Sequence, residues 1–390
     1  MKNPAQRDIY MLGFSRVMRS IAAGMINLAF PYYILQNLHY GAFVLGAIYV
    51  AATVATAGLG LLTGIMTDVW GKRETLVLAN ALLPISALMI YLSSNLWMII
   101  PAAMLGGYSA TGSLAGGGIG GAVQPIQSAV LASLTTGEVR TKYFSFFTFL
   151  AGATGALGAL LAKLFTVQEI FLWSAIISAI GVPGLWLLRV PGVKGKMGRL
   201  KTKTTIGKFT LTGMLNGLSQ GLIMPFLIPF FVLVYHIPKS QMSEYAFASG
   251  LLGSFAILTA PRLERHFGFV KSIVVSRGLG TVLMVIFPII RWLPLSVIIY
   301  LITPALRIAA LPIQQSELTK RVAHEEMGRA LGINQVARLA ASSSGTGLSG
   351  YLMETSFFEL PFFIYGALMI ANLYLYIRFF GERREEAGEE

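Results

Sequence analysis

Two arginines lie deep inside long apolar stretches of the sequence, where a charged side chain is costly. Arg307 and Arg338 are each about eleven residues from the nearer end of their stretch, too deep for the side chain to reach water easily. A guanidinium binds carboxylate or phosphate through two parallel hydrogen bonds. The two residues therefore predict either a water-filled cavity that attracts an anionic solute, or hydrogen bonds to carbonyl groups of neighbouring helices.

Acidic partners for these charges are scarce. Glu317 is the one carboxylate plausibly at membrane depth, and it lies ten residues beyond Arg307, which is about 15 Å along a helix. A direct pair within one helix is therefore not expected. Arg16 and Arg19, three positions apart near the start of the first apolar stretch, share one helix face. They either extend to the lipid headgroups or contribute to a charge pair or to ion coupling.

Amide side chains in other apolar stretches complete the set of candidate solute-binding groups. Asn27 lies two turns or more beyond Arg19, and Asn216 and Gln220 are its approximate counterparts in the second half of the chain. Each remaining amide either faces a cavity or forms a hydrogen bond between helices. These are Gln124, Gln127, Gln314 and Gln315.

The composition indicates the scaffold that must position these residues. The chain of 390 residues is 55% hydrophobic and only 12% charged, with a mean hydropathy of +0.68, which no soluble domain could bury. Continuously apolar stretches of bilayer-crossing length predict an all-α integral membrane protein with twelve transmembrane helices, not a barrel of alternating strands. The predicted spans are 9–36, 41–66, 74–93, 97–134, 142–164, 168–189, 207–235, 244–262, 270–290, 294–318, 327–353 and 357–380.

The net charge of +13 is distributed unevenly between the two sides of the predicted membrane. With twelve spans, both termini fall on one side, and the opposite loops contain only Lys163, Lys239 and Arg291 as bases. An excess of lysine and arginine is typical of cytoplasmic loops. We therefore expect a multi-pass protein of the cell membrane with both termini in the cytoplasm, whose basic residues contact anionic lipid and not nucleic acid.

An internal repeat divides the chain. Residues 122–127 (Ala-Val-Gln-Pro-Ile-Gln) recur at 309–314 (Ala-Ala-Leu-Pro-Ile-Gln), an offset of 187, while Gly71 is matched by Gly268 at an offset of 197. The repeat predicts two pseudo-symmetric six-helix bundles. We place them at 1–189 and 208–380, joined by a basic cytoplasmic linker at 190–207 and followed by an acidic cytoplasmic tail at 381–390.

The two offsets differ by 197 − 187 = 10 residues, which places an insertion in the first half. The glycine-rich segment Gly106–Gly121 is the obvious location. Glycine destabilises a helix by about 1 kcal/mol per position relative to alanine. The segment therefore predicts either a glycine face for close helix packing with an extended loop, or a broken helix whose backbone groups line a solute cavity.

A short charged turn joins the second and third apolar stretches. It reads Gly64-Ile-Met-Thr-Asp68-Val-Trp-Gly71-Lys72-Arg73. In this position the pattern resembles the loop between helices 2 and 3 of the major facilitator superfamily, Gly-x-x-x-Asp-x-x-Gly followed by bases. The resemblance implies a transporter fold with a parallel repeat, in which the glycines allow a tight turn and the charged residues hold one side shut.

The chain departs from the family's pattern in ways that bear on coupling. Val69 stands where many members have a base, and no arginine precedes the glycine segment of the fourth span. The exporter motif of the fifth span survives as Gly152-Ala-Thr-Gly155-Ala-Leu-Gly158, without its proline. Together with the scarcity of acids, these departures argue against proton-driven export of cations.

The sequence therefore predicts a secondary transporter that moves a small organic solute, anionic or neutral, by alternating access. The alternatives are a proton-coupled multidrug efflux antiporter and a membrane sensor of the same fold that does not transport. The four histidines fall in loops without metal-ligand spacing, and no phosphate-binding glycine loop is present. We expect a monomer that is not an enzyme, with no metal and no cofactor, and with a proton or ion as its only candidate coupling partner.

Overall fold

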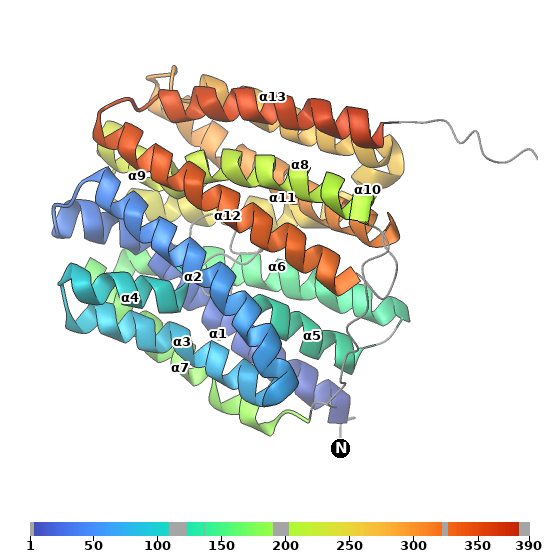
Figure 1. Cartoon of the computed structure of the whole chain (residues 1–390). Helices are drawn as coiled ribbons and strands as arrows, with labels where there is room; N and C mark the ends of the chain where they lie inside the picture. The colour runs from blue at the N-terminus through green and yellow to red at the C-terminus, as the bar shows by residue number, and fades with distance from the viewer. Residues whose placement is uncertain (1–3, 109–122, 136, 190–202, 322–326, 382–390) are drawn as a thin grey trace, which may run out of the picture.

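Helices running along one common direction make up almost all of the described chain (Figure 1). The structure is a computed structural model, and it describes residues 4–108, 123–135, 137–189, 203–321 and 327–381. The helices of the first half are α1 (Pro4–Tyr32), α2 (Ala42–Val69), α3 (Lys72–Leu92), α4 (Leu96–Gly106), α5 (Gln124–Leu134), α6 (Gly137–Leu161) and α7 (Val167–Ile180). Those of the second half are α8 (Lys203–Ile223), α9 (Leu227–Val234), α10 (Lys239–Ile286), α11 (Leu293–Arg321), α12 (Met327–Glu354) and α13 (Leu360–Phe380).

The helices follow the predicted spans with three differences in detail. Helices α4 and α5 both fall within the span predicted at 97–134, and α8 and α9 divide the span predicted at 207–235. Helix α10 covers the spans predicted at 244–262 and 270–290. Within the described ranges, eight helices are long and apolar enough to cross a membrane. The predicted all-α membrane fold is confirmed.

Two glycines make the sharp turns between membrane helices. Gly71 has φ of +100° between α2 and α3, and Gly268 has φ of +74° in the middle of α10. Side chains with a Cβ rarely adopt such angles, so glycine permits both turns. The two residues are 197 positions apart, the offset seen in the sequence, and Gly268 divides α10 into two antiparallel arms (Figure 1).

Four other glycines bring helix backbones together at equivalent places in the two halves. A Cβ at any of them would lie 1.9–2.2 Å from a backbone carbonyl oxygen of the facing helix, so a larger residue would push the helices apart. The contacts are Gly24 on Gly155 and Gly221 on Ser342, then Gly158 on Ile21 and Gly345 on Leu218. The equivalent positions are 187 or 197 residues apart, so the same helix packing occurs twice.

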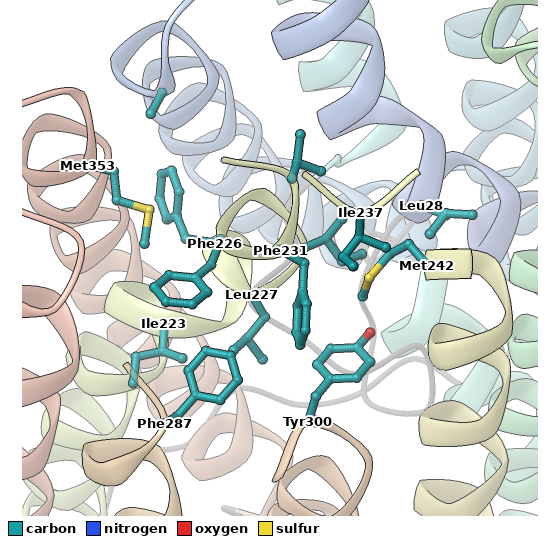
Figure 2. Packing of buried hydrophobic residues seen from close by; sticks show 14 of the residues in the cluster. Leu28, Ile223, Phe226, Leu227, Phe231, Ile237, Met242, Phe287, Tyr300 and Met353 are labelled. Atoms are coloured by element: carbon teal, nitrogen blue, oxygen red, sulfur yellow. The ribbon is translucent and has the colours of Figure 1, made fainter. Parts of the chain in front are cut away.

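The two ends of the bundle differ in how the halves meet. We call the end where α1 begins and α13 finishes the terminal end, and the opposite end the distal end (Figure 1). A large apolar cluster near the distal end contains residues of both halves. Figure 2 shows Leu28 of α1 close to Met242 of α10, so side chains of the two halves meet within this cluster. The halves are therefore sealed by hydrocarbon at the distal end.

The proposed boundaries between the bundles remain a prediction. Most of the predicted linker, residues 190–202, and nearly all of the predicted tail, residues 382–390, lie outside the described residues. Helix α8 begins at Lys203, which lies inside the predicted linker.

Candidate functional site

Polar contacts between the halves reinforce the distal seal. The Tyr32 hydroxyl donates to the Ile237 carbonyl at 2.8 Å. The Lys239 ammonium donates to the carbonyl oxygens of Ala162, at 2.7 Å, and Phe165. Each contact joins one half to the other, so the seal must break before the cavity can open toward the distal end.

Two further contacts close the same end. Lys163 and Glu244 form an ion pair across the halves. The backbone N–H of Phe43, in the first turn of α2, donates to the Glu354 carboxylate at the end of α12 at 3.1 Å. A carboxylate is well placed at a helix N-terminus, where free N–H groups and the helix dipole attract negative charge.

The terminal end is less tightly closed in the part of the chain that the structure describes. Among these residues, a Cβ added at Gly58 or Gly60 of α2, or at Gly332 of α12, would meet nothing within 4 Å. Helices α2 and α12 touch near their distal ends, where a Cβ at Gly46 would lie 3.0 Å from the Cα of Gly350. The two helices diverge toward the terminal end (Figure 1).

A cavity of about 130 Å³ lies between the halves. The first half contributes Asn27 and Tyr49, and the second contributes Ser249, Tyr300 and Arg307, among other residues. Tyr49 and Tyr300 are buried, with 3% and 7% of their surface exposed. The site therefore combines aromatic walls, an amide and one positive charge, a combination that suits a small polar organic molecule.

A proline breaks the helix that borders this cavity between α8 and α9. The chain makes a short 3₁₀ turn at Met224–Phe226. Because Pro225 has no N–H, the Gly221 carbonyl four residues earlier loses its helical donor. The Thr346 hydroxyl of α12 lies 3.1 Å from this oxygen and 2.9 Å from the Ser342 carbonyl of its own helix, so its one proton can be shared between the freed acceptor and α12.

Two more prolines line the cavity and act on their own helices in the same way. Pro304 frees the Tyr300 carbonyl, to which the Ser249 hydroxyl donates at 3.1 Å. Pro31 removes the helical donor of the Asn27 carbonyl. Backbone carbonyls without a helical donor are tolerated inside a membrane where they line a polar cavity. Asn27 therefore offers the cavity both its backbone carbonyl and its side-chain amide.

Arg307 is the charged residue that the sequence predicted and the structure places in the cavity wall. Its Nη1 donates to Gln220 Oε1 at 3.2 Å, and its Nε is buried without a hydrogen-bond partner in the described part of the chain. An anion in the cavity would satisfy this buried donor and neutralise the charge.

Arg338 and Arg277 make different contacts. Arg338 donates to Gln335 one turn earlier in α12, at 2.7 Å. Arg277 is buried between helices: it donates to Gln314 Oε1 at 2.6 Å and to Asn372 Oδ1 at 3.4 Å. These contacts give Arg277 a packing role. The sequence analysis did not single it out, although a lone arginine inside the span at 270–290 is itself a signal.

Other predicted residues lie away from the cavity wall. Arg16 and Arg19 are buried in the protein, which argues against their extending to lipid headgroups, and Arg16 donates to Gln127 Oε1. Asn216 is also buried, and its Oδ1 has no hydrogen-bond partner in the described ranges.

Gln124 is half-buried at the start of α5. No charge pair between Arg307 and Glu317 is found among the described side chains.

The predicted gating turn is described only in part. Arg73 forms an ion pair with the adjacent Glu74 at 2.6 Å, and Lys72 begins α3. The side chain of Asp68 and the surroundings of Gly64 lie outside the described part, as does the side chain of Gln315. In the glycine-rich segment, α4 ends at Gly106 and Gly107 adopts a left-handed conformation, while residues 109–122 are not described.

Known structures share this architecture. A mutant of the nucleoside transporter NupG aligns over 97% of this chain and 100% of its own, with 14% identity and a TM-score of 0.76. An inward-facing, occupied bacterial homologue of the human lysosomal transporter Spinster covers 97% of each chain at 11% identity, with a TM-score of 0.77. The human organic anion transporter MFSD10 covers 96% of this chain and 100% of its own at 12% identity, with a TM-score of 0.66. At these identities, the similarities show the fold alone.

A search of curated protein sequences finds no match. The sequence model of the Major Facilitator Superfamily, however, matches residues 12–346, which is most of the chain. This match agrees with the all-α membrane fold, the repeated glycine contacts and the cavity between the halves. The chain belongs to the Major Facilitator Superfamily.

Proposed function

We propose that this protein is a secondary transporter that moves a small organic solute, anionic or neutral, by alternating access. The cavity between the halves is sealed at the distal end, and the helices diverge toward the terminal end. The excess of basic residues in its loops supports a cytoplasmic terminal end, and we place the protein in the cell membrane as part of the same proposal. On this assignment the structure represents an inward-open state, and the inward-facing Spinster homologue supports the same interpretation.

Arg307 carries the proposal for the solute. It is the one charged side chain among the described residues that line the cavity, and its hydrogen-bonding capacity is incompletely used. An arginine can bind a carboxylate or phosphate with two hydrogen bonds. Across the cavity, the Asn27 amide and the Tyr49 ring can bind the uncharged part of such a molecule.

We propose that the glycine and charged residues of the turn at 64–73 close the terminal end in the other state of the transport cycle, in which the distal end is open. Gly71 already provides the tight turn that this role requires. The coupling of transport to a proton or ion, and the monomeric state, are part of the same proposal and rest on the family resemblance.

A ligand screen followed by transport tests this function. Purified protein would be melted with a panel of dicarboxylates, phosphorylated sugars, nucleosides and neutral sugars, because related folds include a nucleoside transporter and an organic anion transporter. We expect at least one anion to raise the melting temperature. Liposomes containing the protein should then take up the labelled compound faster than empty liposomes.

Variants of Arg307 test whether the anion binds at the proposed site. Arg307→Ala should weaken binding of the anion by about 1.5–3 kcal/mol if a charge-assisted hydrogen bond is lost. Arg307→Lys should bind the anion with intermediate affinity, because lysine keeps the positive charge but cannot form two parallel hydrogen bonds as a guanidinium does. Arg291→Ala, in a distal loop, is the matched control. Unchanged uptake of an anion by a stable Arg307→Ala, Arg338→Ala variant would refute the anion site.

A further inference from the structure

A second cavity lies on the seam between α6 and α10, toward the terminal end. Its volume is about 500 Å³, and it is lined by Lys142, Ser145, Phe146 and Phe149 of α6 and by Leu258 of α10. The α6 residues are three or four positions apart, so they share one face of the helix. The residues form a groove with an apolar floor and a basic rim, and we call it the seam groove.

The apolar lining favours hydrocarbon over water as the occupant. Phe146 and Leu258 are 53% and 47% exposed, so the groove leaves large apolar side chains uncovered. Among the residues that the structure describes, none that lines the groove is acidic. Lys142 lies in the second turn of α6, at the depth where a lysine reaches the membrane surface. A molecule with a hydrocarbon chain and an anionic head matches this arrangement, in which apolar side chains lie within the membrane and a lysine lies at its surface.

Two aromatic rings separate the seam groove from the solute cavity. Phe149 of α6 and Phe255 of α10 pack with centroids 5.4 Å apart. On the distal side of this pair, Gly152, three residues beyond Phe149, and Ser254, next to Phe255, line the solute cavity instead. An occupant of the seam groove therefore does not share the site of Arg307, and this inference does not rest on the identity of the solute.

The seam widens along its length. Near the distal end a Cβ at Gly250 would lie 2.9 Å from Ala156 Cβ, so α6 and α10 are in close contact there. Toward the terminal end the same two helices leave the seam groove between them. A chain inserted at that point would act as a wedge between the halves and oppose closure of the terminal end.

We propose that the seam groove binds one anionic phospholipid from the leaflet on the terminal side, and that this lipid favours the open terminal end. Its acyl chain lies between Phe146 and Leu258 and ends at the Phe149–Phe255 pair. Its phosphate contacts Lys142, and the Ser145 hydroxyl can donate a further hydrogen bond. Basic residues at the membrane surface attract anionic headgroups in this way.

Native mass spectrometry of the full-length, delipidated protein tests the site. The protein would be titrated with phosphatidylglycerol and with phosphatidylcholine of the same acyl chains. We expect wild type to retain one phosphatidylglycerol in preference to phosphatidylcholine, and Lys142→Gln to reduce that preference about fivefold, the effect expected of one lysine at an anionic surface. Leu258→Trp should fill the groove and reduce retention of both lipids.

Matched variants distinguish the seam groove from general surface effects. Lys271→Gln removes another exposed lysine at the terminal end, and Leu252→Trp enlarges another exposed leucine of α10; neither residue lines the groove. Both should bind lipid as wild type does. Equal retention of the two lipids by wild type, or wild-type retention by Lys142→Gln or by Leu258→Trp, would overturn the proposed site.

A distance measurement tests the wedge. Because the chain has no cysteine, spin labels can be placed at Leu62→Cys and Ile333→Cys, two exposed positions near the terminal ends of α2 and α12. We expect the longer distance to be more populated in phosphatidylglycerol nanodiscs than in phosphatidylcholine nanodiscs, and Leu258→Trp to abolish the difference. The same distances in both lipids would overturn the effect on opening.

Discussion

The two halves of the molecule repeat their helix packing but not the arginines inside their membrane spans. The glycine contacts of Gly24 and Gly158 in the first half recur at Gly221 and Gly345 in the second, against equivalent backbone positions. The arginines do not recur. Moving back by the repeat offsets from Arg277, Arg307 and Arg338 leads to Asn80, Gly120 and Ala151.

The contrast separates the demands of folding from those of function. Backbone contacts that occur in both halves are required to form a bundle, so they follow the repeat. A buried charge stabilises neither bundle by itself, since its desolvation is unfavourable. Charges present in only one half must therefore be explained by particular partners, and in the case of Arg307 the partner we propose is the solute.

The largest effect should come from filling the repeated glycine contacts. Gly158→Leu and Gly345→Leu should each destabilise the protein by more than about 3 kcal/mol, because the new side chain meets backbone that cannot move without separating two helices. Gly58→Leu is the control, since a Cβ there meets nothing within 4 Å. Size-exclusion profiles and yields in detergent measure the result. Normal yield of either variant would show that the repeated contact is dispensable.

The next effect compares two arginines of the second half. Arg277→Ala should lower stability by about 1.5–3 kcal/mol, because Gln314 and Asn372 lose a charged donor in a buried site. Arg307→Ala should change stability much less, since within the described part of the chain its one hydrogen bond is to Gln220. Melting temperatures without ligand measure both. A lower melting temperature for Arg307→Ala than for Arg277→Ala would reverse the proposed roles.

A smaller effect concerns the helix break in the second half. Thr346→Val removes the hydroxyl that serves the Gly221 carbonyl freed by Pro225, and it should lower stability by about 0.6–1.7 kcal/mol, the range measured for hydrogen bonds between membrane helices. Thr259→Val is the control, because the Thr259 hydroxyl bonds only its own helix, at Ala256, in an exposed position. Equal melting temperatures for both variants would mean that the freed carbonyl needs no donor.

The smallest effect should come from the ion pair that joins the halves at the distal end. The side chains of Lys163 and Glu244 are 44% and 51% exposed, so solvent screens their attraction. A double-mutant cycle with Lys163→Gln and Glu244→Gln should give a coupling of about 0.2–1 kcal/mol that falls as salt is added. A coupling well above this range, insensitive to salt, would make the pair a principal lock between the halves.

The sequence was sufficient for the features that depend on composition and local backbone geometry. Apolar stretches located the helices, and the match of Gly71 with Gly268 identified two positions that share a positive φ. Pairing between distant side chains was not accessible in the same way. Nothing in the spacing of Arg277 specifies Gln314 and Asn372 as its partners, because hydropathy does not reveal which helix faces which.

The site was predicted in outline and not in detail. The sequence offered Asn27 and Arg307 as candidate solute-binding residues, with hydrogen bonding between helices as the alternative for Arg307. Both line the cavity between the halves, whereas Gln127 and Gln314 bond to buried arginines. The break at Pro225 was also missed, since a proline within an apolar span can either kink the helix or end it. The outcome depends on whether a neighbouring helix supplies a donor for the freed carbonyl, as Thr346 does here.

The hydrocarbon seal at the distal end has a thermal consequence. Parting the halves at Leu28 and Met242 would expose apolar surface of this cluster to water, which raises the heat capacity of the opened form. Because the association of apolar groups weakens on cooling, we expect the seal to loosen as the temperature falls. If the protein alternates between two forms as we propose, the free-energy difference between them should vary with temperature in a curve, and the form open at the distal end should gain population in the cold.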